Sequence, residues 1–141
     1  MRRLEDYIAI LLVVAGAFAV VSLSTCKPAE ASEIPQEVKA IIGEAIGQSD
    51  KEILAHCHAL RNRGTLKGVY GLNNWHKHNT PKNVARVTKL WIQSGKEADF
   101  TKGCNHWLSD YDLTHYKPKL MAWRFKADYS VKVGSTTFYR L

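Results

Sequence analysis

The sequence predicts an α+β fold, with helices in its first part and irregular and β structure in its last part. Apolar residues recur at three- and four-residue spacing in three segments, and this periodicity fades beyond Glu97. Residues 129–141 alternate instead, around a Gly-Ser pair suited to a hairpin turn. With 141 residues, 45% hydrophobic and 23% charged, the chain has the size and composition of a single globular domain.

The N-terminal segment differs from this domain. Residues 7–25 carry no charge and follow a pair of arginines, a pattern typical of an export signal or a membrane anchor. Three alternatives for this segment agree with the sequence: a signal peptide cleaved after the Ala-Glu-Ala of residues 29–31, a lipoprotein signal whose box ends at Cys26, or a membrane anchor that is retained. A helix buried in the core is the alternative that would not export the chain.

Export would divide the chain into a leader, residues 1–31, and an extracytoplasmic domain, residues 32–141. The leader contains as many acidic as basic residues, so the domain keeps the whole net charge of +7. A basic exported domain suits an anionic partner such as a cell-wall polymer, lipid head groups or nucleic acid. The basic residues are scattered along the chain, so general solubility is an equally simple explanation.

Two cysteines, Cys57 and Cys104, belong to the predicted domain. In an oxidising compartment they could close a loop of 47 residues, and such a bridge would stabilise the fold by about 4 kcal/mol. The alternative is a pair of buried free thiols.

The first predicted helix follows Pro35 and ends at Gly47. Its apolar face is formed by Val38, Ile41, Ile42, Ala45 and Ile46. Glu44 lies about 120° from the centre of this face, at the edge between core and solvent. Gly43 and Gly47 would leave room beside its carboxylate, which could then act as a general acid if half-buried. The alternative is a solvated glutamate near a helix-ending glycine.

Two further helices are marked by their ends. Ser49 and Glu52 form a capping-box pattern that opens the second helix, and Gly64 ends it. A Thr-Pro pair at residues 80–81 opens the third helix, and Gly95 ends it.

The remaining segments are predicted from turn residues and alternation. Residues 65–71 are partly β-like and residues 73–79 form a polar loop. Residues 99–112 are expected to form turns around a short extended piece. The final hairpin turns at Gly134-Ser135.

Three stretches of the chain, in order, resemble the spore cortex-lytic enzyme and cell wall hydrolase family. The first, residues 41–64, contains the Glu-Ala-x-Gly motif at residues 44–47 and ends in Asn-Arg at residues 62–63. The second is "DFTKGCNHW", residues 99–107, and the third is "KVGSTTFYR", residues 132–140. Together they span almost the whole predicted domain.

The resemblance implies a small lysozyme-like domain that cleaves the glycan strands of peptidoglycan, with Glu44 as the catalytic acid. The sequence departs from the family pattern at two places. Gln48 stands where a second Glu is common, and Thr136-Thr137 stands where a His is common. These departures bear on how substrate is positioned, and they keep open a protein that binds the wall without cutting it.

Glycoside hydrolysis ordinarily needs two carboxylates. The candidates for a second one are Asp99, Asp110, Asp112 and Asp128. A lytic transglycosylase needs a single Glu, which acts as acid and then as base and forms a 1,6-anhydro sugar, and the resemblance favours this route. No cofactor is required.

Substrate-binding residues are expected among aromatic and amide or hydroxyl side chains of the motifs and loops. Aromatic rings can stack on sugars, and polar groups can hydrogen-bond acetamido groups, although core packing is the simpler role for each aromatic residue. The candidates are Tyr70, Trp75, Thr101, Asn105, Trp107 and Tyr139.

Two rival functions can be weighed from the sequence. A metal site is disfavoured because His56 and His58 point about 160° apart on a helix, which leaves the pair His76 and His78. Nucleic-acid binding is disfavoured because the chain has no stripe of Lys and Arg and no recognition-helix motif.

Overall fold

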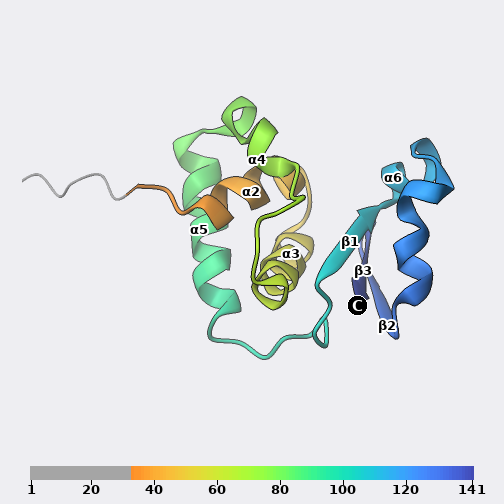
Figure 1. The fold of residues 1–141 in the computed structure, drawn as a ribbon. Coiled ribbons are helices and arrows are strands. Elements are labelled where there is room, and N and C mark those ends of the chain that lie inside the picture. Colours follow the sequence, from red (N-terminus) through yellow and green to blue (C-terminus); the bar gives the residue numbers. More distant parts are fainter. Residues whose placement is uncertain (1–32) are drawn as a thin grey trace, which may run out of the picture. The chain divides into compact units, whose positions relative to one another are not determined.

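Helices build the first part of the molecule and a three-stranded sheet the second, so the predicted α+β class is confirmed (Figure 1). The computed structural model describes residues 33–141. The elements are helices α2 (Gln36–Ala45), α3 (Asp50–Arg63), α4 (Gly71–Asn74), α5 (Pro81–Ser94) and α6 (Asp110–His115), the 3₁₀ helices η2 (Trp75–His78) and η3 (Pro118–Lys126), and strands β1 (His106–Ser109), β2 (Tyr129–Val133) and β3 (Thr136–Arg140).

The three long helices begin where the sequence predicts, and α3 and α5 also end there, whereas α2 ends at Ala45, before the predicted Gly47. The Ser49 side chain accepts from the Glu52 amide at 3.3 Å, and Thr80 does the same for Asn83 at 3.2 Å. Gly64 ends α3 in the left-handed conformation, with φ of 65°. Short polar residues at the helix starts and glycine at the end of α3 therefore determine these boundaries locally.

The helices α2, α3 and α5 enclose the main hydrophobic core. Its largest fully buried members come from the predicted face of α2, from α3 and from α5: Val38, Ile42, Ile53, Cys57 and Val87. Burial of these side chains stabilises the helical part.

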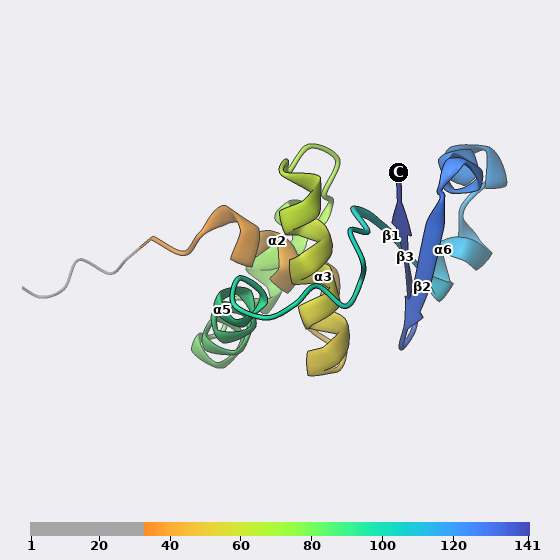
Figure 2. The ribbon, with the colours of Figure 1, turned by 90° about the horizontal axis from the view of Figure 1, so that it is seen from below.

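The sheet has the strand order β1-β3-β2, and both pairings are antiparallel. Trp107, Phe138 and Val131 are paired across it and therefore share one face. Phe138 is fully buried with alanines of α3 in a second core cluster. Viewed from below, the sheet lies between α3 and the segment of α6 and η3 (Figure 2).

Four segments differ from the sequence prediction. Residues 73–78 are helical rather than part of a loop, because Trp75 packs against the main core. Neither α6 nor η3 was expected. A capping box at Ser109 and Asp112 opens α6, and Met121 of η3 is buried. The partly β-like character of residues 65–71 does not lead to a strand.

The predicted disulfide is not formed. Cys57 and Cys104 are both free and buried, and they lie in different core clusters. Burial raises the pKa of Cys57 to about 12 and that of Cys104 to about 11, so both thiols are protonated and unreactive at neutral pH.

The predicted leader, with its cleavage sites and Cys26, lies outside the described residues. Within residues 33–141, no helix has both the length and the apolar character that crossing a bilayer requires.

Candidate active site

Glu44 lies near the end of α2 and is half-buried, as its position on the helix predicts. Its Oε1 accepts a hydrogen bond from the backbone N–H of Gly71 at 2.7 Å. The indole N–H of Trp107 and the backbone of Tyr70 also interact with the carboxylate. Segments far apart in the sequence thus meet at one carboxyl group.

A pair of glycines makes this meeting possible. A Cβ on Gly43 would overlap the carbonyl group of Gly71, and a Cβ on Gly71 would overlap Ala40 and Glu44. The backbones of α2 and α4 can therefore approach only because neither residue has a side chain. The sequence interpretation of Gly43 was wrong in this respect, because the space beside it is filled by Gly71. Gly47, by contrast, has open space around it.

The pKa of Glu44 is raised above its ordinary value. Burial of the carboxyl group is the largest cause, and the negative charge of Asp112 adds to it. Hydrogen bonds from Gly71 and Trp107 act in the opposite direction without cancelling the rise. A half-buried carboxyl group with a raised pKa can hold a proton nearer to neutral pH and deliver it to a substrate oxygen.

Asp112 is the aspartate that the structure associates with Glu44. It lies in the first turn of α6, where its Oδ2 accepts from the backbone N–H and hydroxyl of Ser109, both at 2.8 Å. The other candidates are engaged elsewhere: Asp110 pairs with Lys132, and Asp128 pairs with Arg140, which lies on β3. Asp99, the fourth candidate, organises a turn.

A buried histidine packs against the ring of Trp107. The His56 ring makes edge contacts with Trp107 and Phe138, with ring centroids 5.4 and 4.9 Å apart. Its Nδ1 lies 2.9 Å from the carbonyl oxygen of Glu52, and burial lowers the His56 pKa to about 4. His56 is therefore neutral at physiological pH and helps to orient the indole next to Glu44.

Two other predicted aromatic residues belong to the segment that contacts α2. Tyr70 precedes Gly71 directly, and its side chain is 75% exposed, so it is available for a ligand. Trp75 is half-buried against the main core, with the Lys39 ammonium 5.0 Å from its ring centroid.

The structure assigns the remaining predicted binding residues to the fold. Tyr139 is 9% exposed and lies on the sheet face opposite Trp107, where it contacts Trp123. Thr101 is fully buried and bonds to Asp99. Asn105 exchanges two hydrogen bonds with the backbone of Leu141, at 3.0 and 3.1 Å. None of these three side chains contacts Glu44 in the way that Trp107 does.

The second family-like stretch is a turn tied to the end of α3. Asp99 accepts from the backbone N–H groups of Thr101 and Gly103, both at 2.8 Å. Asn62 donates to Asp99 and to the carbonyl oxygen of Cys104, both at 2.9 Å. The Asn of the first stretch and the Asp-x-Thr-x-Gly of the second therefore form one structural unit.

The two departures from the family pattern contact each other. Gln48 Nε2 donates to Thr136 Oγ1 at 3.2 Å, although the two residues are 88 positions apart. Gln48 Oε1 is buried and has no hydrogen-bond partner within the described part of the chain. Arg86 of α5 holds the same loop by donating to the carbonyl oxygens of Ile46 and Gln48 at 3.0 and 2.9 Å. Gln48 and Thr136 therefore form a neutral amide–hydroxyl pair between this loop and β3.

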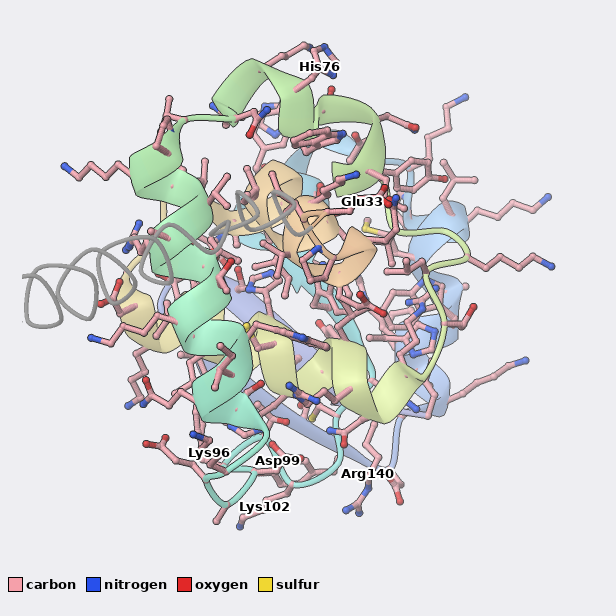
Figure 3. All side chains as sticks on the ribbon, turned by 90° about the vertical axis from the view of Figure 1, so that its left-hand side faces the viewer. Glu33, His76, Lys96, Asp99, Lys102 and Arg140 are labelled. Carbon is pink, nitrogen blue, oxygen red and sulfur yellow. The ribbon has the colours of Figure 1, made fainter. Side chains whose placement is uncertain are left out.

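No group of three or more His, Cys, Asp or Glu side chains in residues 33–141 could hold a metal ion. His56 faces Trp107, whereas His58 faces Phe100 and Asp99, as their separation on α3 predicts. His76 and Asp99 lie at opposite ends of the molecule (Figure 3).

Comparisons of the chain with protein-family models, curated proteins and solved structures give no match.

Proposed function

We propose that this protein is an exported enzyme that cleaves the glycan strands of peptidoglycan, with Glu44 as the proton donor. The observation that carries the proposal is the half-buried Glu44 carboxyl group, whose pKa is raised while its position is held by Gly71 and Trp107. The resemblance of the three motif stretches supplies the substrate class. In this proposal the fold is a small lysozyme-like domain, delivered by residues 1–31.

The chemistry needs one carboxyl group at two steps. Glu44 first donates its proton to the glycosidic oxygen as the bond to the anomeric carbon breaks. The resulting carboxylate then takes the proton of the C6 hydroxyl of the muramic acid, and the C6 oxygen bonds to the anomeric carbon. A 1,6-anhydro sugar forms and no water is consumed. The Trp107 indole and the backbone of Tyr70 both interact with the Glu44 carboxylate, so these two aromatic residues lie beside the proposed proton donor.

Asp112 offers a variation on this mechanism, because a second carboxylate could activate water and give hydrolysis instead. Mass spectrometry of the released fragments separates the two reactions: anhydro-muropeptides indicate transglycosylation, and reducing ends indicate hydrolysis. In either case Asp112→Asn removes a negative charge near Glu44, so the pKa of Glu44 should fall. If the reaction is transglycosylation, the high-pH limb of the pH–rate profile should then move to lower pH. If Asp112 instead activates water, the variant should lose most of its activity.

The direct test is digestion of purified peptidoglycan by the wild-type protein and by Glu44→Gln. We expect the variant to lose at least about a hundredfold in rate, since general-acid catalysis contributes about 10² to 10⁴. Glu97→Gln is a matched control at an exposed glutamate and should keep its cleavage rate. Undiminished digestion by Glu44→Gln would disprove the assignment of the acid.

A wall-binding protein without catalytic activity is the second candidate. The neutral pair Gln48 and Thr136 favours it, because both positions differ from the family pattern and the two side chains touch. In that case the wild-type protein would sediment with insoluble peptidoglycan and release no soluble fragments.

A further inference from the structure

A hollow of about 470 Å³ lies at the opposite end of α2 from Glu44. It is lined by Glu37 of α2, by Leu60 and Arg61 at the end of α3, by Leu66 in the following loop and by Trp91 of α5. Glu37 precedes Glu44 by seven residues, or about 10 Å along the helix. The hollow is therefore separate from the candidate active site, and its volume is in the range of small-ligand sites.

Arg61 is held in a fixed position beside this hollow. Its Nε donates to Ser94 Oγ at 2.8 Å, its Nη2 donates to the carbonyl oxygen of Trp91 at 2.7 Å, and its guanidinium carbon lies 3.8 Å from the centre of the Trp91 ring. Gly95 leaves space for the guanidinium, since a Cβ there would lie 3.1 Å from Nη2. No hydrogen bond or ion pair within residues 33–141 uses Nη1, so this edge is available to a ligand.

The hollow also contains a carboxylate that is separate from this cation. Glu37 is half-exposed in the first turn of α2, and within the described residues no ion pair joins it to Arg61. Leu60, Leu66 and Trp91 contribute apolar side chains to the same lining. A ligand that matches this lining has an anionic end, a cationic group and an aliphatic part.

We propose that this hollow binds a short peptide through its terminal carboxylate and an ammonium group. A fixed guanidinium on an aromatic ring recognises a carboxylate with little loss of conformational entropy, and Glu37 would bind the ammonium. A neutral glycan would use neither charge, and a multiply charged anion would be repelled by Glu37. On the basis of the proposed function, the peptide is the stem peptide that is attached to muramic acid in peptidoglycan.

The test measures peptide binding to the full-length protein by calorimetry, with no cleavage involved. The probe is N-acetyl-L-Ala-γ-D-Glu-L-Lys-D-Ala-D-Ala, in which the lysine carries the single ammonium group, compared with its C-terminal amide and with its Nε-acetyl-lysine form. We expect each modification to weaken binding by about tenfold, as the loss of a charged hydrogen bond does. Arg61→Gln should bind the acid and the amide equally, and Glu37→Gln should bind the lysine and acetyl-lysine forms equally.

Lys89→Gln is the matched control, since it removes one positive charge from the exposed side of α5. This variant should still bind the acid more tightly than the amide, and the lysine form more tightly than the acetyl-lysine form. Equal binding of acid and amide by the wild-type protein would overturn the proposal, and this comparison does not depend on how well any variant folds. Equal binding of the all-L, α-linked peptide of the same composition would overturn the assignment to the stem peptide.

The outcome is independent of catalysis by Glu44. If the protein binds the C-terminal acid more tightly than the amide but leaves peptidoglycan intact in the digestion assay, the result would support this site and contradict the proposed enzyme. Cleavage that depends on Glu44 without any preference between acid and amide would support the enzyme and contradict this site.

Discussion

Glu52 is expected to hold the sheet against the helices, and the substitution Glu52→Gln tests this. Its Oε1 accepts from the Ser135 backbone N–H at 2.6 Å and from the Ser135 hydroxyl at 3.0 Å, and Oε2 accepts from the Ser49 hydroxyl at 3.3 Å. The side chain is 7% exposed and presses against Gly134, whose φ is 59° and which has no room for a Cβ. The carboxylate therefore anchors the hairpin turn to α3.

The magnitude follows from these bonds. A hydrogen bond to a charged group contributes about 1.5 to 3 kcal/mol, and a neutral one about 0.5 to 1.5 kcal/mol. The glutamine keeps an acceptor oxygen but not the charge, so Glu52→Gln should lower the free energy of unfolding at pH 7 by about 2 kcal/mol. For a domain of this size the Tm should fall by roughly 10 °C.

The pH dependence provides a sharper criterion. Burial raises the pKa of Glu52, but the bonds from Ser135 and Ser49 outweigh burial, and the net pKa is below its ordinary value. A carboxyl group with a lowered folded-state pKa stabilises the protein above its unfolded-state pKa, and this stabilisation is lost as pH falls through the folded-state pKa. The gap between wild type and Glu52→Gln should thus be widest near pH 7 and narrow in acid.

Urea unfolding followed by tryptophan fluorescence at several pH values measures this gap. Glu97→Gln serves as the control, because Glu97 is exposed and its bond from Gln93, at 2.8 Å, can be made to an amide oxygen as well. A gap below about 0.5 kcal/mol at pH 7, or one that stays constant down to acid pH, would refute the role of the Glu52 charge.

Three further predictions address the site and the core. Because the pKa of Glu44 is raised on folding, its ionisation opposes folding as pH rises. At pH 7 the variant Glu44→Gln should therefore unfold at a higher urea concentration than the wild-type protein, and this difference should disappear at low pH. A variant that is less stable than wild type at pH 7 would contradict this prediction. Gly43→Ala should cost at least about 2 kcal/mol in urea unfolding because its Cβ meets backbone, whereas Gly47→Ala, in open space, should change stability by less than about 1 kcal/mol. Iodoacetamide should alkylate Cys57 and Cys104 only after unfolding, and a non-reduced mass showing them joined would contradict free thiols.

Helix boundaries were predictable because the interactions that determine them are local. Ser49 and Thr80 bond to amides three residues away, and Gly64 adopts a conformation that glycine favours. The hairpin turn at Gly134 follows from the same kind of local preference. The periodicity of α2 also placed Glu44 correctly at the border of the core.

The short helices were missed because tertiary contacts stabilise them. Trp75 lies in a polar stretch that by itself resembles a loop, and packing of its ring on the main core makes that stretch helical. Met121 is buried in the same way within a segment rich in Lys and Arg. Local propensity is a weak signal in such segments, and a single buried side chain can override it.

Local and tertiary interactions contribute separately to the candidate site as well. The sequence alone singled out Glu44 as the proposed acid, because this residue falls at the edge of an apolar helix face within a Glu-Ala-x-Gly motif. Only the tertiary structure decided the environment of this carboxyl group, because the Gly71 amide, the Trp107 indole and Asp112 come from segments distant in the chain. The close approach of α2 and α4 likewise depends on the contact between Gly43 and Gly71. The physical reason is the sequence separation over which these interactions act. Helix capping and periodicity depend on residues a few positions apart, whereas the burial of a carboxylate and the charges around it depend on segments that only the folded structure brings together.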